Sequence, residues 1–158
     1  DDDVSDYVFR EYPLDILVRQ CVRRFSAEFI DRHIRLEYTP AEYTVVTDEK
    51  WFCFVLEQLL SNALKYTREG GCVRISLQGD TLCVADTGIG IAPEDLPRIF
   101  EKGYTGGNGR LDKKASGLGL YLCRRICQAL GIRLTADSVV GQGTTLYLCL
   151  KQYALKPE

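Results

Sequence analysis

Apolar side chains recur every three or four residues in three stretches of the chain, which is the spacing of one face of a helix. The stretches are 15–29, 49–67 and a third that follows 117–120 and runs to 130. Asp48 stands just before the second stretch, where its carboxylate can cap the first turn of a helix, and Gly131 directly follows the third. The pattern predicts three helices, each with one buried face.

Shorter stretches between these helices alternate apolar and polar residues, as half-buried strands do. We expect a hairpin after each helix, with strands at 34–38 and 44–47, at 73–77 and 82–85, and at 134–138 and 144–150. This order of helices and hairpins predicts an α+β fold. Its form would be a two-layer sandwich, in which a mixed, mainly antiparallel sheet of about five strands is covered on one face by about three helices.

The stretch between the second hairpin and the third helix has a different character. A short helix is predicted at 93–100, and residues 102–116 then contain four glycines and few apolar anchors. A loop of that length inside a compact domain is usually either a functional lid or disordered. We therefore expect a single domain over 1–158, with a core at about 14–150 and a lid at about 92–116.

Composition narrows the class of partner. The 158 residues carry a net charge of -2, so any anion site must be local, and we expect neither nucleic acid nor an anionic membrane as a partner. No apolar run approaches the roughly 18 residues that span a bilayer. The seven cysteines lie inside apolar patterns and the chain has one histidine, so we expect buried thiols rather than a zinc site.

Candidate chemistry begins at Asp86, which ends an apolar strand and precedes Gly88 and Gly90. A carboxylate in that position can accept a hydrogen bond from an exocyclic amine, and the glycines let the backbone approach a planar ligand. An ordinary turn would have the same local sequence. The stretch alone therefore leaves a ligand site and a turn equally open.

Two further patterns favour the ligand site. The second predicted helix carries a polar stripe beside its apolar face, and the amide of Asn62 in this stripe is an oxygen ligand suited to Mg²⁺. Gly117 and Gly119 precede the third helix, where free amides and the helix dipole favour a phosphate. Local positive charge can come from Lys65, Arg110, Lys113 and Lys114. Together these features predict an ATP·Mg²⁺ site.

Four stretches, in this order, resemble the sequence boxes of the catalytic ATP-binding domain of bacterial sensor histidine kinases, within the GHKL superfamily. They are an N box at 57–67, a G1 box at 86–91, an F box at 99–103 and a G2 box at 117–121. The chain has neither the glycine-rich loop of P-loop enzymes nor the His-Arg-Asp triplet of eukaryotic-type kinases. The resemblance implies a Bergerat (GHKL) sandwich that binds ATP and Mg²⁺.

The resemblance also implies roles for individual residues. Asp86 would bind the adenine amine, Asn62 would hold Mg²⁺, and Lys65 and Tyr66 would flank the phosphates or the adenine. The catalytic candidates are Asn62, Lys65 and Gln58. The remaining nucleotide-binding candidates are Gly88, Gly90, Ile91, Phe100, Lys102, Gly106, Arg110, Gly117, Leu118, Gly119, Leu120, Thr144 and Thr145.

Two departures from the pattern bear on the reaction. Position 58 is Gln, whereas a Glu there could act as a general base toward water, so phosphotransfer is favoured over hydrolysis. Kinases of this type place their phospho-accepting histidine in a separate helical hairpin. His33 stands instead at a helix–strand joint, where we expect an ordinary surface residue. We therefore expect a fragment that binds ATP and lacks its own phosphoacceptor.

The implied partners are ATP, the dimerisation and histidine-phosphotransfer domain of the same full-length protein, and a response regulator. The full-length protein would be a membrane-anchored homodimer, and this fragment a cytoplasmic monomer without direct membrane contact. The phrase at 100–110 resembles intramembrane-sensing kinases that respond to peptide antibiotics. Two alternatives remain open: an anti-sigma-factor-like serine kinase and a GHKL conformational ATPase of the gyrase type. A binding-only pseudokinase would lack Asn62, Asp86 or a glycine of the G2 box, and all of these are present.

Overall fold

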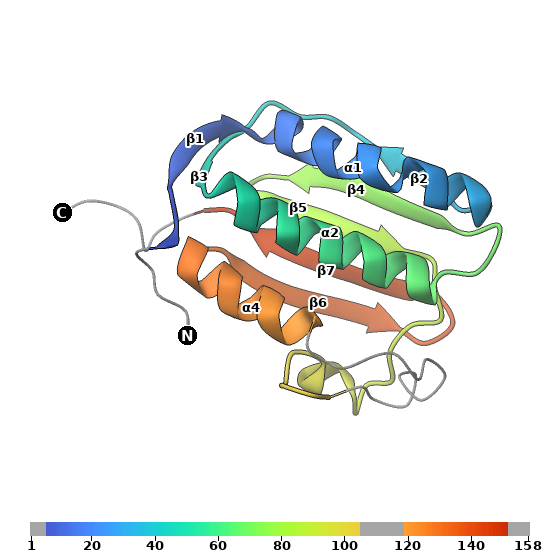
Figure 1. Cartoon of the computed structure of the whole chain (residues 1–158). Helices are drawn as coiled ribbons and strands as arrows, with labels where there is room; N and C mark the ends of the chain where they lie inside the picture. The colour runs from blue at the N-terminus through green and yellow to red at the C-terminus, as the bar shows by residue number, and fades with distance from the viewer. Residues whose placement is uncertain (1–5, 105–118, 152–158) are drawn as a thin grey trace.

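The computed structural model describes residues 6–104 and 119–151 of the chain (Figure 1). Its three longer helices lie where the apolar spacing predicts them. In chain order the elements are β1 (Arg10–Pro13), α1 (Leu14–Asp31), β2 (Arg35–Tyr38), β3 (Thr44–Thr47), α2 (Glu49–Tyr66), β4 (Cys72–Gln78), β5 (Thr81–Asp86), the 3-10 turn η2 (Leu96–Arg98), α4 (Gly119–Leu130), β6 (Arg133–Val139) and β7 (Gly143–Cys149).

The molecule has two layers. Five strands form one sheet in the order β2-β4-β5-β7-β6, and α1, α2 and α4 cover one face of it (Figure 1). β2 runs parallel to β4, while every other pair in this sheet is antiparallel. The predicted α+β sandwich with a mixed, mainly antiparallel sheet is confirmed. The register of β5 on β7 sets Asp86 opposite Thr144, and the register of β7 on β6 sets Thr144 opposite Ser138.

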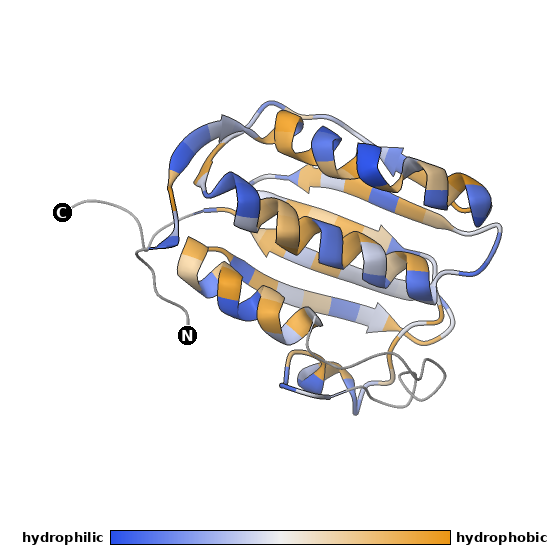
Figure 2. Cartoon of the chain, in the orientation of Figure 1, coloured by the Kyte–Doolittle hydropathy of each residue, from blue (hydrophilic) through white to orange (hydrophobic). Residues whose placement is uncertain are grey.

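The core lies between the helices and the sheet. α2 runs across its centre and buries one continuous face, while the outward sides of the helices mix hydrophilic and hydrophobic residues (Figure 2). The predicted cap of α2 is confirmed, because Asp48 accepts a hydrogen bond from the backbone N–H of Trp51 at 3.0 Å. The buried side chains of α2 are Phe52, Cys53, Val55, Leu56, Leu59, Leu60, Ala63 and Leu64.

The first predicted hairpin is wrong. β2 does not pair with β3. It pairs with β4 instead, with Leu36 beside Val73, while β3 forms a separate two-stranded sheet with β1, with Val45 beside Tyr12. Alternation of side chains specifies which face of a strand is buried, but it does not specify the neighbouring strand. β1 has only four residues and three of them are exposed, so no buried pattern marked it.

The helix predicted at 93–100 is also wrong in length, because it shrinks to the single 3-10 turn η2. Pro97 lies inside it and has no backbone N–H to continue a helical ladder. The two later hairpins, β4–β5 and β6–β7, are confirmed. No helix among the described residues is long and apolar enough to cross a membrane.

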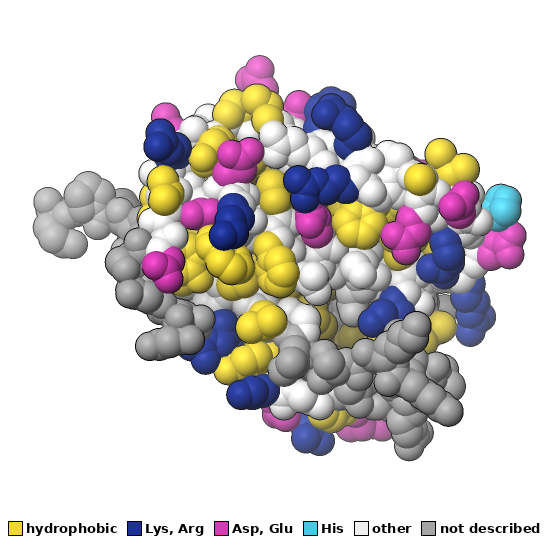
Figure 3. Space-filling view, in the orientation of Figure 1, with side chains coloured by type: hydrophobic (Ala, Val, Ile, Leu, Met, Phe, Trp, Pro, Cys, Tyr) yellow, Lys and Arg dark blue, Asp and Glu magenta, His cyan; other side chains and the backbone are white. Residues whose placement is uncertain are grey.

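The charged side chains and the cysteines are distributed as the near-neutral net charge and the apolar surroundings of the cysteines in the sequence predict. Acidic and basic side chains are interspersed over the helical face (Figure 3). All seven cysteines carry free thiols and six of them are buried, as expected for packing residues. Burial raises the pKa of Cys127 to about 12, so this thiol is a poor nucleophile at neutral pH.

Candidate functional site

Asp86 is the last residue of β5, at the end of the sheet where α2 also ends. One carboxylate oxygen, Oδ1, accepts hydrogen bonds from the backbone N–H of Gly88 at 2.8 Å and of Thr144 at 3.2 Å. Burial raises the pKa of the Asp86 carboxyl, and the two N–H donors partly oppose that rise. A carboxylate has acceptor capacity on both oxygens, so the second oxygen remains suited to an amine of a ligand.

The loop that follows Asp86 is held in place along its whole length. Thr87 donates its N–H to the carbonyl of Cys72 at 3.0 Å, and its hydroxyl accepts the N–H of Cys72 at 2.9 Å. Ile89 donates to the carbonyl of Tyr66 at 3.1 Å and accepts the N–H of Gly141 at 2.8 Å. The loop is therefore fastened to β4, to the end of α2 and to the β6–β7 turn, which preorganises it.

Both predicted glycines of this loop are required by close backbone contacts. A Cβ atom at Gly88 would lie 2.3 Å from the carbonyl oxygen of Tyr66. A Cβ atom at Gly90 would lie 2.3 Å from the carbonyl oxygen of Val139, and the φ of Gly90 is +78°. The glycines thus let the loop pack against its own protein, which explains them without a ligand. Their approach to a nucleotide base stays a prediction.

The polar stripe of α2 lies at the same end of the sheet. Asn62 is half-buried, and its amide makes no side-chain hydrogen bond within the described residues. Lys65 is exposed, and its Nζ lies 6.0 Å from the centroid of the Tyr66 ring. A Cβ atom at Gly119 would lie 3.0 Å from Oε1 of Gln58, so the start of α4 meets this stripe.

The residues after η2 pack against α4. The guanidinium carbon of Arg124 lies 4.1 Å from the centroid of the Phe100 ring, and Nζ of Lys102 lies 5.9 Å from that of Tyr121. Leu120, in the first turn of α4, is half-buried against the core. The predicted Phe100 and Lys102 thus lie against α4, the helix that begins with the predicted Gly119 and Leu120, and the contact of these four residues with a nucleotide stays a prediction.

Several predicted residues are not placed at the site. Gly106, Arg110, Gly117 and Leu118 lie outside the described residues, as do Lys113, Lys114 and the rest of the predicted lid from 105 to 116. Thr145 follows Thr144 on β7, and side chains alternate along a strand, so its side chain leaves the opposite face of the sheet. In the register of β5 on β7, Thr145 stands opposite Ala85 rather than Asp86.

Sequence reasoning missed Ser138, which lies on β6 at the same end of the sheet. Its Oγ accepts the backbone N–H of Ile91 at 2.7 Å and also contacts the carbonyl of Gly143 and the hydroxyl of Thr144. No motif marked it, because Ser138 reaches Ile91 across 47 positions of the chain. The strand order alone brings the two residues together.

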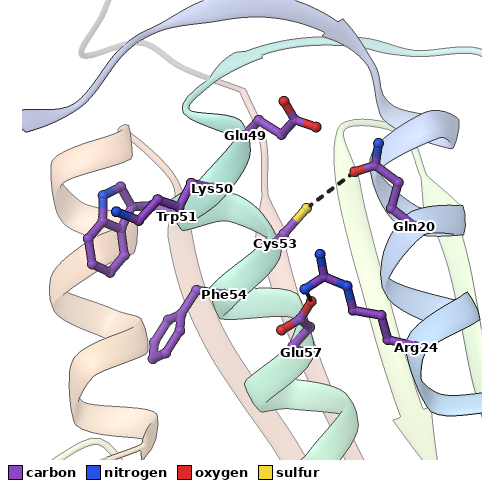
Figure 4. Close-up of a pocket in the computed structure, with 8 residues that line it drawn as sticks. All are labelled: Gln20, Arg24, Glu49, Lys50, Trp51, Cys53, Phe54 and Glu57. Carbon is purple, nitrogen blue, oxygen red and sulfur yellow. Dashed lines mark hydrogen bonds and ion pairs between the residues drawn. The ribbon is translucent and has the colours of Figure 1, made fainter.

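A separate groove of about 510 Å³ opens between α1 and the N-terminal half of α2 (Figure 4). Its wall includes the ion pair of Arg24 with Glu57, at 2.5 Å, and Cys53 close to Gln20. Asn62 lies further along α2, and none of the predicted site residues lines this groove. The groove is therefore distinct from the site around Asp86.

The oxygen atoms of Asp86 and Asn62 are of the kind that an adenine nucleotide with a bound cation requires. Asp86 offers an acceptor for the exocyclic amine, and the Asn62 amide is the kind of neutral oxygen ligand that Mg²⁺ accepts alongside phosphates and water. The described residues contain no cluster of three His, Cys, Asp or Glu that could hold a metal ion by itself. A cation here would therefore depend on phosphate oxygens for most of its ligands.

Curated proteins with sequences similar to this chain include bacterial sensor kinases. The sensor protein BceS of Halalkalibacterium halodurans is 38% identical over 147 residues, covering 91% of this chain and 44% of BceS. The sensor histidine kinase GraS of Staphylococcus epidermidis is 42% identical over 115 residues, covering 70% of this chain and 33% of GraS. The chain thus spans less than half the length of these relatives.

Solved structures share the fold. The mycobacterial sensor histidine kinase MprB superposes with a TM-score of 0.77 at 23% identity, over 89% of this chain and 95% of that one. Full-length ShkA in complex with AMPPNP superposes with a TM-score of 0.73 at 27% identity, over 90% of this chain and 30% of that one. The fold predicted from the four sequence boxes is the fold of these kinases.

The family assignment rests on a direct match. The family model described as histidine kinase-, DNA gyrase B- and HSP90-like ATPase matches residues 47–154. This range contains α2, the loop after Asp86, α4 and the last hairpin, which together build the site. The chain belongs to the histidine kinase-, DNA gyrase B- and HSP90-like ATPase family.

Proposed function

We propose that this chain is the ATP-binding catalytic domain of a sensor histidine kinase. It transfers the γ-phosphoryl group of ATP to a histidine on a separate helical domain, from which a response regulator receives it. The observation that carries the proposal is the Asp86 carboxylate, held by the backbone N–H groups of Gly88 and Thr144, at the start of a loop that is fastened to the end of α2, the helix that carries Asn62. Sensor kinases among the relatives support the same reaction class.

The residues divide the work of binding. Asp86 accepts a hydrogen bond from the adenine amine, and the preorganised loop at 87–91 supplies the wall against which the base packs. Asn62 and Lys65 of α2 face the phosphate end, where Lys65 adds positive charge. Bound Mg²⁺ would neutralise phosphate charge as the γ-phosphoryl group leaves. Catalysis is then mostly a matter of positioning, because the nucleophile arrives with the partner domain.

Gln58 favours transfer over hydrolysis. It lies one helical turn before Asn62 on α2, and its Oε1 is within reach of the start of α4. An amide cannot take a proton from water as a carboxylate can. The conformational ATPase and the binding-only pseudokinase are therefore weaker alternatives, since the first would use a carboxylate here and the second would lack Asn62 or Asp86. The serine kinase alternative differs only in the acceptor residue.

His33 has a structural role of its own. It is exposed, has a φ of 56° just after α1, and its Nδ1 lies 3.1 Å from a carboxylate oxygen of Glu69. Its carbonyl accepts the N–H of Gly70 at 2.8 Å, which fastens the α1–β2 turn to the segment after α2. This single histidine of the chain is accounted for by the turn, so we place the phosphoacceptor on the partner domain.

The proposal extends to the whole protein. We infer that it is a membrane-anchored homodimeric sensor whose kinase region lies in the cytoplasm, of the intramembrane-sensing kind that responds to peptide antibiotics. The chain covers 44% of BceS and 33% of GraS, so a further part of similar size would hold the membrane segments and the helical hairpin. By itself, this domain would be a monomer.

The test is transfer of label from ATP. The chain is incubated with ATP labelled on the γ-phosphate and with the helical hairpin of its full-length protein, supplied separately. Acid-labile label on the hairpin histidine supports the proposal, and a hairpin with that histidine replaced is the control. Acid-stable label on a serine would favour the serine kinase, and phosphate release without labelled protein would favour the ATPase.

A further inference from the structure

Ser138 makes an unusually complete set of contacts for a strand-end serine. Its Oγ lies 2.7 Å from the N of Ile91, 2.9 Å from the carbonyl oxygen of Gly143 and 2.8 Å from Oγ1 of Thr144. A serine hydroxyl has one proton and two lone pairs. The contact with Ile91 uses one lone pair, because an N–H can only donate. The contact with Gly143 uses the proton, because a carbonyl can only accept.

These two assignments fix the third. With its proton given to Gly143 and one lone pair taken by Ile91, Ser138 can only accept from Thr144. The proton of the Thr144 hydroxyl therefore points at Ser138, and the lone pairs of Thr144 Oγ1 point elsewhere. Thr144 is buried, it stands beside Asp86 in the strand register, and its own N–H is 3.2 Å from Asp86 Oδ1.

We propose that Ser138 is a positioning residue that makes this site selective for adenine, which carries an amine at position 6, over guanine, which carries a carbonyl there. Because the Thr144 hydroxyl donates its hydrogen bond to Ser138, Asp86 and Thr144 together offer a bound base only hydrogen-bond acceptors. An amine such as that of adenine donates to such a pair, whereas the carbonyl of guanine meets lone pairs and is rejected. The inference rests on the proposed function, since it assigns the base preference of the same nucleotide site.

Ser138 also holds the second end of the loop. Asp86 begins the loop and is fixed by Thr144, while Ile91 ends it and is fixed by Ser138, and these two partners contact each other. The loop is thus closed into a ring by Thr144, which holds Asp86 through its backbone N–H, and by the hydroxyl of Ser138 on the neighbouring strand, which holds Ile91 and contacts the hydroxyl of Thr144. Loss of the Ser138 hydroxyl would leave the Ile91 N–H and the Gly143 carbonyl without this partner and free the Thr144 hydroxyl to rotate.

The experiment compares ADP and GDP binding by calorimetry in Ser138→Ala, Ser138→Thr and Ser138→Val. We expect Ser138→Ala and Ser138→Val to weaken ADP binding about tenfold, the effect of one lost hydrogen bond, and to lower the ratio of ADP affinity to GDP affinity. Ser138→Thr retains the hydroxyl, so its ADP affinity and its affinity ratio should stay at the wild-type level. Val has nearly the shape of Thr but lacks the hydroxyl. Ser76→Ala, a half-buried serine of β4, is the control and should bind like the wild type.

The possible results distinguish a failure of the role proposed for Ser138 from a failure of the proposed ATP-binding function. If the wild type binds no adenine nucleotide, the proposed function fails. If the wild type prefers ADP and Ser138→Ala and Ser138→Val keep the same ADP-to-GDP ratio, the role of Ser138 is refuted. Thermal melts check that each variant is folded. Should the Ser138 variants unfold, Thr144→Val removes the same acceptor while retaining the backbone bond to Asp86, and an unchanged ratio there refutes the proposal equally.

Discussion

The backbone N–H of Thr144 donates to Oδ1 of Asp86 at 3.2 Å, although 58 positions separate the two residues in the chain. The register of β5 on β7 sets them opposite each other, so the last strand of the sheet orients the carboxylate that ends a central one. Asp86 is therefore part of a fixed framework rather than a flexible turn residue. The predictions below follow from that framework and from the helix beside it.

Asn62→Ala should remove the Mg²⁺ dependence of nucleotide binding. We expect ATP affinity with Mg²⁺ to fall to the level measured with a chelator, because the amide oxygen is the protein ligand for the cation. Titrations of both forms with and without Mg²⁺ measure this directly. Ser61→Ala, an exposed neighbour on α2, is the matched control. Full phosphotransfer by Asn62→Ala would exclude the metal role.

Gln58→Glu should raise ATP hydrolysis in the absence of a phosphoacceptor. A carboxylate at this position can act as a general base toward water, a contribution of roughly 100-fold or more when the geometry is favourable. Because the site positions ATP for another nucleophile, we expect a gain nearer tenfold. Phosphate release is the measurement, and Gln58→Ala, which adds no base, is the control. A variant that binds ATP and releases no more phosphate than the wild type contradicts the assignment.

Gly88→Ala should destabilise the fold, not merely weaken binding. The new Cβ would lie 2.3 Å from the Tyr66 carbonyl oxygen, a backbone atom at the end of α2 that cannot move aside alone. The expected loss of unfolding free energy is about 1–3 kcal/mol, as for other overpacked sites. Urea denaturation measures it. Gly79→Asn is the control, because the space around Gly79 is open and Asn tolerates its φ of +61°. Equal stability of both variants would contradict the packing role.

Nucleotide affinity should depend on pH through Asp86. Burial raises the pKa of this carboxyl, so the loss of the charged acceptor on acidification begins at a higher pH than for an exposed Asp, whose pKa is about 3.9. At pH values between the pKa of Asp86 in the unfolded chain and its raised pKa in the folded protein, the folded protein binds more protons than the unfolded chain. The contribution of Asp86 to stability therefore falls as the pH rises through this range. Asp86→Asn should flatten both profiles. An ADP affinity that is constant down to pH 4 would contradict the shift.

The sequence predicted the helices better than it predicted the strand neighbours. The apolar spacing placed α2 and its cap correctly, while the roles of Asp86 and Asn62, which stand in recognisable boxes, stay predictions. The partner of β2 could not be predicted in this way, because β4 lies more than 30 residues later and alternation does not specify a neighbour. Ser138 was missed for the same reason, since only the order β7-β6 brings it to Ile91.

Chemistry of single residues explains the other differences. Pro97 reduced a predicted helix to one 3-10 turn, because it lacks the N–H that the ladder needs. Gly88 and Gly90 were assigned to a ligand, yet close contacts with Tyr66 and Val139 already require them. A glycine pattern in a sequence reports that something lies near the backbone, but it does not report whether that neighbour is a ligand or the protein itself.

The central claim is that Asp86 selects the nucleotide through a hydrogen bond to the adenine amine. Calorimetric titration of ADP into Asp86→Asn tests it most directly, because the variant is nearly the same shape and can still accept the N–H groups of Gly88 and Thr144 through its oxygen. Its amide nitrogen, turned to the ligand, would oppose the amine with a second donor. We predict a loss of ADP affinity of at least 100-fold in a variant that melts like the wild type. Wild-type affinity in that folded variant would contradict the account.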